Sequence, residues 1–251
     1  MTRYGAEIAK PKPMNILEMR TLRGPNYWSG YWKKLIVMRL DIGDYEEKPT
    51  DRIDGFTERM MELMPSIITH GCSYKEEGGF KRRVEEGTWA GHVIEHFALE
   101  LQTLAGMDTG YGRTRETSET GIYNVVFSYT EEEVGRYAGR ASVQLFLDIA
   151  ESKPLAEVRD SISDNVQKMR EIREEVRFGP STGSLVEEAE SRNIPYIRLN
   201  DQSLVQLGYG VYQKRIQATT TANTNMIAVD IAANKHATKV SATSPTYCRS
   251  I

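Results

Sequence analysis

Apolar and polar positions along the chain predict a first region that mixes strands and helices. Two stretches near the N-terminus, MNILEMRTLRG at 14–24 and KLIVMRLDIG at 34–43, are expected to be strands, and the second is apolar on both of its faces. The stretch GIYNVVFSYT at 121–130 gives the clearest strand pattern, because it is aromatic and β-branched.

Three helices are expected between and after these strands. The stretch 51–67 has a roughly helical apolar stripe that Pro65 ends or kinks. A second helix runs from about Thr88 to Leu104 and is stopped by Gly106. The third, at 131–150, opens with three acidic residues, which suit the positive end of a helix dipole.

The order strand–strand–helix–helix–strand–helix favours an α+β fold, a small mixed sheet packed with helices. We assign this domain to residues 14–152, after a flexible leader at 1–13 that contains two prolines. A charged amphipathic helix at 153–177 is expected to be a connector. Its apolar positions recur every three or four residues: Leu155, Val158, Ile162, Val166 and Met169.

The stretch GPSTGS marks a boundary before a second segment at 178–239. This segment reads as a helix, a short strand, a glycine-containing pair of strands or loops, and a final helical stretch. The end of the chain, 240–251, has no periodicity and is expected to be an unstructured tail.

Composition narrows the class of protein. Of 251 residues, 39% are hydrophobic and 27% are charged, as in a globular protein, and the net charge of −3 gives no support for nucleic-acid binding. No apolar run is long enough to span a bilayer, and the N-terminus lacks the apolar core of a secretion signal, so a cytoplasmic protein without membrane contact is expected. Cys72 and Cys248 are expected to be free thiols.

The stretch HVIEH at 92–96 carries the strongest chemical signal. At about 100° per residue, His92, Glu95 and His96 share one face of the predicted helix with Leu99 and Thr103, while the core stripe lies on the opposite face. The two imidazoles are therefore one turn apart and can reach one metal ion. A polar face that is merely solvated is the competing interpretation.

The order His-x-x-Glu-His is that of inverted zincins. A catalytic zinc takes three protein ligands and leaves one position for water, whose proton a nearby carboxylate accepts. On this reading His92 and His96 are ligands and Glu95 is the general base. Any of the three acids that open the helix at 131 is a candidate third ligand, although such acids usually serve the helix dipole, and Glu100 competes with them.

Two further stretches have two readings each. Arg113 and Arg115 lie in GYGRTRET, a glycine-flanked loop that could clamp a substrate carboxylate or simply be solvated. For His70 and Cys72, packing in the core is favoured over metal binding.

Several long motifs, taken together, resemble a known family. TLRGPNYWS, GTWAGHVIEHFALELQTLAGM, GYGRTRET, GIYNVVFSY, VQLGYGVYQKRIQAT and NKHATK appear in the order found in the N-terminal part of cyanophycin synthetases, over about residues 14–239. Full-length members also carry an ATP-grasp domain that adds aspartate and a Mur-ligase-like domain that adds arginine. After Lys239 the chain departs from the family pattern, so the resemblance implies only an incomplete ATP-grasp α/β segment at 178–239.

The resemblance also assigns roles. It implies that the N-terminal domain binds cyanophycin, a poly-aspartate chain with arginine side chains, and hydrolyses its backbone at a zinc site to make primers. It favours Glu132 among Glu131, Glu132 and Glu133 as third ligand, places Arg113 and Arg115 towards the polymer, and matches Lys235 to a lysine near the nucleotide.

Cofactors and alternatives follow from the same resemblance. ATP and Mg are implied only for the full-length synthetase, whose members are expected to be homo-oligomers. A non-catalytic polymer-binding module is the alternative function for this chain.

Overall fold

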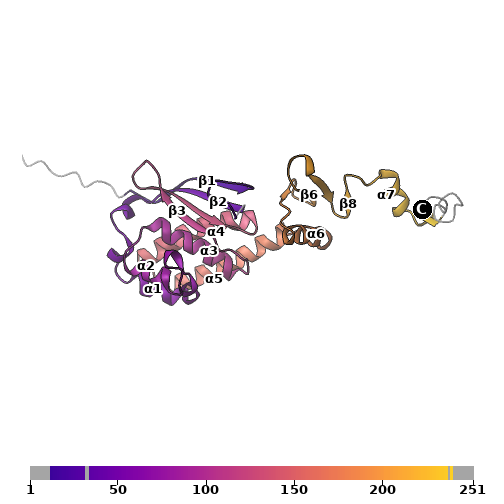
Figure 1. Cartoon of the computed structure of the whole chain (residues 1–251). Coiled ribbons are helices and arrows are strands. Elements are labelled where there is room, and N and C mark those ends of the chain that lie inside the picture. Colours follow the sequence, from indigo (N-terminus) through magenta and orange to yellow (C-terminus); the bar gives the residue numbers. More distant parts are fainter. Residues whose placement is uncertain (1–11, 32–33, 237, 240–251) are drawn as a thin grey trace, which may run out of the picture. The chain divides into compact units, whose positions relative to one another are not determined.

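The computed structural model describes residues 12–31, 34–236 and 238–239. The leader predicted at 1–13 therefore lies mostly outside the described residues, and the tail at 240–251, with Cys248, lies wholly outside them. The chain divides into two compact units, Met1–Val176 and Arg177–Ile251. Figure 1 shows the helices and strands of each unit.

The first unit is built on a four-stranded antiparallel sheet of order β1-β2-β4-β3. Its strands are β1 (Asn15–Arg23), β2 (Lys34–Asp41), β3 (Gly112–Glu116) and β4 (Ile122–Ser128). The predicted α+β class is confirmed, but the sheet is wholly antiparallel rather than mixed. The stretch GYGRTRET, read as a loop, contains β3 instead, which pairs with β4 at the edge of the sheet.

Helices cover one face of this sheet. The principal ones are α3 (Ala90–Leu104), α4 (Glu132–Ala150) and α5 (Leu155–Val176), with the shorter α1 (Phe56–Leu63) and α2 (Gly79–Glu85) beside them. Helix α3 packs on β3 and β4, and α4 packs on α3 and β2. Short 3-10 turns at Gly43–Glu46, Thr50–Arg52, Pro65–Thr69 and Cys72–Tyr74 connect these elements.

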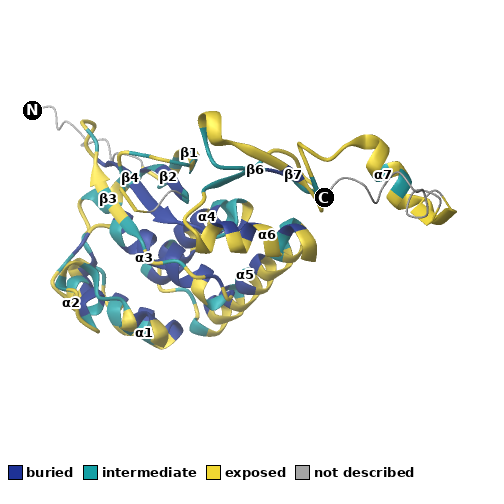
Figure 2. Ribbon diagram, turned by 45° about the vertical axis from the view of Figure 1, so that its right-hand side comes forward, coloured by how far each residue is buried: buried dark blue, intermediate teal, exposed yellow. Residues whose placement is uncertain are grey.

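Strand β2 is apolar on both faces, so its sequence could not show which face is buried. Its residues Ile36, Met38 and Leu40 join the main core under the helices. The alternate residues Leu35 and Val37 pack with Val126 in a smaller cluster on the opposite face. Both faces are therefore buried. Figure 2 shows the buried residues concentrated in β2, β4, α3 and α4, whereas β3 is largely exposed.

Helix α3 follows its sequence signals closely. It begins at Ala90, two residues later than expected, and its chain leaves the helix at Gly106, as predicted. Gly106 has φ +85°, a left-handed conformation that glycine adopts without the strain of a Cβ.

The predicted connector helix is α5, which packs against α4 and α3. Val158, Ile162, Val166 and Met169 are buried, as the periodicity predicted, and α5 lies against α4. The first compact unit therefore extends to Val176, beyond the boundary placed at residue 152.

The second unit holds α6 (Pro180–Ser191) and a four-stranded antiparallel sheet, β5-β6-β7-β8, followed by α7 (Met226–Ala233). The strands are β5 (Tyr196–Arg198), β6 (Leu204–Leu207), β7 (Lys214–Gln217) and β8 (Thr220–Thr221), with a 3-10 turn at Gly210–Tyr212. Its small core consists of Val186, Val205 and Ile216. Helix α6 begins inside GPSTGS. Pro180 suits its first turn, because proline has no backbone N–H that would be left without a partner there.

Candidate functional site

The polar face of α3 lines a cavity of about 990 Å³ in the first unit. His92, Glu95, His96, Leu99 and Thr103 all contribute to its wall, so the face predicted from the helical wheel is confirmed. The site is not a solvated surface, however. Glu95 is only 4% exposed and His96 only 7%.

The opposite wall of the cavity comes from the turns between α1 and α2, which supply His70 and Cys72. The Cys72 Sγ lies 3.2 Å from Nε2 of His92, and Nδ1 of His70 lies 2.8 Å from Nδ1 of His96. Cys72 packs against the main core, as expected, and both side chains also lie against the histidines of α3. His70 follows one short 3-10 turn and Cys72 begins the next, and no periodic pattern in these residues could have shown which side chains face α3.

Three of these side chains have donor atoms that can share one ion. The ligand atoms of Cys72, His92 and His96 all lie within 4.8 Å of one another. A zinc–sulfur bond is about 2.3 Å and a zinc–nitrogen bond about 2.0–2.1 Å, so small side-chain rotations bring all three donors to one centre. Thiolate and imidazole are also the donor types that zinc prefers.

The histidines are held in the neutral state that metal binding requires. Burial lowers the pKa of His92 to about 4, with a further contribution from the charge of Arg83, and burial also lowers the pKa of His96. Both rings are therefore uncharged at neutral pH. The Thr88 hydroxyl lies 3.0 Å from Nδ1 of His92, which leaves Nε2 of that ring directed at Cys72.

Glu95 is the carboxylate next to this cluster. Its Oε1 is 3.9 Å from Nε2 of His96, and its Oε2 accepts a 2.6 Å hydrogen bond from the Thr114 hydroxyl on β3. Burial raises the pKa of Glu95 to about 8, although the Thr114 hydrogen bond and the charges of Arg115 and Arg113 oppose the shift. A cation bound nearby would favour the ionised form, which is the form that can accept a proton.

The third ligand expected from the resemblance lies elsewhere. Glu132 stands at the start of α4, and its carboxylate accepts two hydrogen bonds from the Arg23 guanidinium on β1, at 2.6 and 2.7 Å. Among the described residues, none of Glu131, Glu132 and Glu133 lines the cavity. The structure thus brings His92, His96 and Glu95 together and does not bring Glu132 to them.

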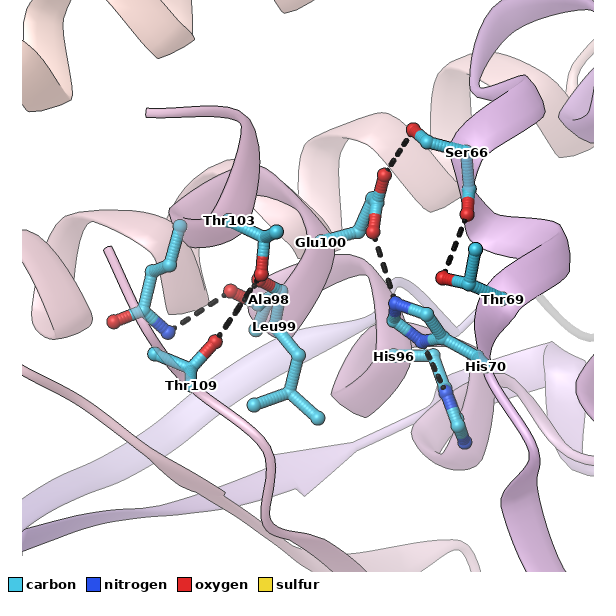
Figure 3. A network of polar contacts seen from close by, with 10 residues as sticks. Ser66, Thr69, His70, His96, Ala98, Leu99, Glu100, Thr103 and Thr109 are labelled. Carbon is cyan, nitrogen blue, oxygen red and sulfur yellow. Dashed lines mark hydrogen bonds and ion pairs between the residues drawn. The ribbon is translucent and has the colours of Figure 1, made fainter. Parts of the chain in front are cut away.

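The competing carboxylate, Glu100, does line the cavity but is occupied by other partners. It accepts hydrogen bonds from the Ser66 hydroxyl and from Nε2 of His70 at 2.9 Å (Figure 3). Burial raises the pKa of Glu100, but these two hydrogen bonds outweigh it and leave the pKa below its ordinary value. Glu100 is therefore an ionised, buried partner of His70.

Four basic side chains line the same cavity: Lys75, Arg83, Arg113 and Arg115. None of them forms an ion pair with a carboxylate of the described residues, so their charges are available to a ligand. Arg113 and Arg115 belong to the edge strand β3, which carries them at fixed positions rather than on a loop. Lys235, expected near a nucleotide, is exposed just after α7 in the second unit.

Among the described residues, no helix combines the length and the apolar character that a bilayer-spanning segment needs.

Comparisons with known proteins agree with the sequence motifs. Residues 36–151 match the family model described as cyanophycin synthase-like N-terminal domain. The chain is 51% identical over 228 residues to a cyanophycin synthetase of Crocosphaera subtropica, and 49% identical over 226 residues to that of Geminocystis herdmanii. Each alignment covers 90% of this chain but only 26% of the relative, so the chain spans about a quarter of their length. Residues 36–151 of this chain thus form a domain of the cyanophycin synthase-like N-terminal family.

Proposed function

We propose that the first unit of this chain binds cyanophycin and hydrolyses its backbone at a metal centre formed by His92, His96 and Cys72. The single observation that carries this proposal is the convergence of three metal-binding side chains and one buried carboxylate in one cavity. The substrate is taken from the relatives, which are named for the polymer cyanophycin.

A zinc ion held by these donors would supply a Lewis acid that activates water and polarises an amide carbonyl. Glu95 acts as the general base, because its carboxylate lies in the same cavity, 3.9 Å from Nε2 of His96. Thr114 holds the Glu95 carboxylate in place by its hydrogen bond, so the base is oriented before the substrate arrives.

The unpaired basic groups of the cavity favour a substrate that carries carboxylates. Each repeat of cyanophycin has one carboxylate and one guanidinium, and the carboxylate can pair with a guanidinium of the protein in a planar, two-point geometry. Arg113 and Arg115 flank Thr114 on β3 and line the cavity, and their charges lower the pKa of Glu95. We propose that they hold the polymer across the cavity.

The activities of the full-length relatives are a separate matter. A role of Lys235 in holding ATP with Mg, as part of an ATP-grasp segment at 178–239, is a proposal that rests on sequence resemblance. It involves the second unit only, so the hydrolase proposal does not depend on it.

The test uses the purified chain. Bound metal is measured by elemental analysis, and purified cyanophycin is incubated with the zinc-loaded protein and sized on denaturing gels. Shorter polymer is expected with wild type. Glu95→Gln is expected to keep zinc and lose at least about 100-fold in cleavage rate, as for removal of a general base. Glu157→Gln, an exposed glutamate on α5, serves as the matched control and should cleave normally.

The same protein samples distinguish the two functions predicted from sequence, hydrolysis and binding without catalysis. A non-catalytic binding module would hold the polymer in the presence of a chelator but produce no shorter chains with zinc. Cleavage that survives Glu95→Gln unchanged would show that Glu95 is not the base.

A further inference from the structure

A chain of hydrogen bonds leads from Ser66 through Glu100 and His70 to His96 (Figure 3). Nε2 of His70 lies 2.9 Å from Oε2 of Glu100, and Nδ1 of His70 lies 2.8 Å from Nδ1 of His96. The two middle members are shielded from solvent: the side chain of His70 is 15% exposed and that of Glu100 is 2% exposed. The proposed metal ligands do not include His70 or Glu100.

The direction of each hydrogen bond follows from the donors available. Glu100 is an ionised carboxylate and can only accept, so the Ser66 hydroxyl and the His70 Nε2–H must donate to it. His70 therefore carries a proton on Nε2.

The contact with His70 determines which nitrogen of His96 is left for a metal ion. Nδ1 of His96 lies against Nδ1 of His70, so Nε2 is the ring nitrogen that can bind the metal. A metal-binding Nε2 carries no proton, so the proton of His96 belongs on Nδ1, which donates it to Nδ1 of His70. Nε2 of His96 is then left with a lone pair, and this nitrogen is the one on the side of Glu95, 3.9 Å from Oε1. A lone pair on Nε2 is what a metal ion requires of this ring.

Packing prevents the ring from turning over. The ring of Phe80 is stacked on that of His96, with centroids 3.8 Å apart and planes inclined by 19°. Phe80 also meets His92 edge-on, so one buried side chain holds both histidines.

We propose that His70 and Glu100 are positioning residues that fix the tautomer of His96, so that its Nε2 is presented to the metal. This inference rests on the proposed metal centre, but the tautomer of His96 can be measured in the metal-free protein. The general pattern is a metal-bound histidine whose other nitrogen donates to a carboxylate, with one histidine inserted between them here.

The tautomer is tested first, on metal-free wild-type protein. Long-range ¹H–¹⁵N correlation spectra distinguish a proton on Nδ1 from one on Nε2. We expect His96 to carry the proton on Nδ1 and His70 on Nε2. A His96 ring with its proton on Nε2 would overturn the inference, whatever the protein does with metal or polymer.

Variants of His70 then test the consequence for metal binding. Gln at position 70 can accept from His96 and donate to Glu100, whereas Phe keeps a ring but offers neither. We expect His70→Phe to weaken zinc affinity 10–100-fold, measured by competition with a chromophoric chelator, and His70→Gln to stay within about threefold of wild type. His236→Phe, which alters an exposed histidine of the second unit, should have no effect.

The visible spectrum of the cobalt-substituted protein gives a second readout. His70→Phe is expected to change the ligand-field bands of Co²⁺, and His70→Gln to preserve them. Equal affinities in wild type and His70→Phe, or an equal loss in both variants, would overturn the positioning role. Wild-type protein that shows the expected tautomers but binds no metal would instead contradict the proposed function and leave the hydrogen-bond direction standing.

Discussion

Gly112 lies directly against the carboxylate of Glu95. A Cβ added to Gly112 would be 2.2 Å from Oε1 of Glu95 and 2.7 Å from its Cδ, far inside contact distance. The edge strand β3 thus approaches α3 so closely that only glycine leaves room for the proposed base. The hydrogen bond from Thr114, two residues along the same strand, holds the carboxylate from the other oxygen.

Gly112→Ala is therefore expected to displace the Glu95 carboxylate while leaving the fold intact, since Gly112 does not have a positive φ. Misplacing a catalytic group by about 1 Å can cost about 100-fold in rate, and we expect a loss of this order in cyanophycin cleavage. Zinc content should not change. Gly179→Ala, at a glycine with nothing within 4 Å of an added Cβ, is the matched control. Full cleavage by Gly112→Ala would show that the carboxylate position is not critical.

The sequence predicted the helix that carries the site because α3 has strong local signals. Its apolar stripe and Gly106 set its extent, and the helical wheel placed His92, Glu95 and His96 on the cavity side. Strand β3 was missed because GRTRE has no apolar alternation. Only pairing with β4 makes it a strand, and no pattern within these residues reports that pairing.

The third ligand could not be found from sequence for a similar reason. Cys72 is 20 residues before His92 and lies in a short 3-10 turn, so only tertiary packing brings them together. Glu132 looked available because three acids open α4. Its partner Arg23 comes from β1, more than a hundred residues earlier, and the sequence gives no sign of that contact.

The burial of Glu95 predicts an unusual dependence of stability on pH. Its pKa in the folded protein is about 8, against an ordinary value of 4.5, so the folded state holds the proton more tightly than the unfolded state. A raised pKa contributes stability that is complete below about pH 4.5 and is lost as pH rises through about 8. Gln at this position cannot ionise, and so avoids the loss.

We expect metal-free Glu95→Gln to gain stability relative to wild type between pH 5 and pH 8.5, by roughly 3–4 kcal/mol. Urea unfolding followed by tryptophan fluorescence, with a chelator present, measures this difference. Glu157→Gln should show no such change. A difference between Glu95→Gln and wild type that stays constant from pH 5 to 8.5 would contradict the raised pKa.

The basic groups on β3 predict a defect in substrate binding rather than in chemistry. Arg113→Gln and Arg115→Gln each remove one unpaired charge from the cavity wall. We expect each to raise KM for cyanophycin by about 3–10-fold, as for the loss of a partly exposed charge-assisted contact, with kcat within about twofold. Binding by wild type should weaken as salt is added.

Arg20→Gln, on β1 and outside the cavity, is the control for loss of an arginine. A fall in kcat with unchanged KM in the β3 variants would mean that these residues act on Glu95 rather than on the polymer.

The two candidates for the third metal ligand, Cys72 from geometry and Glu132 from resemblance, predict opposite results. Cys72→Ser replaces a thiolate donor that lies 3.2 Å from His92 Nε2 with a poor zinc ligand. We expect zinc affinity to fall at least about tenfold and the thiolate-to-metal absorption of the cobalt protein to disappear. Glu132→Gln should leave both unchanged, because its carboxylate is held by Arg23.

Glu132→Gln should show only a small change in stability, about 0–1 kcal/mol, since the Arg23 side chain is 59% exposed and the pair is screened by solvent. Thermal unfolding of the metal-free protein measures this. If Glu132→Gln loses the metal and Cys72→Ser keeps it, the start of α4 must reach the histidines in the metal-bound protein. Loss of metal in both variants would require a four-donor centre, in which the ion has no position open for water and the chain could not act as a hydrolase.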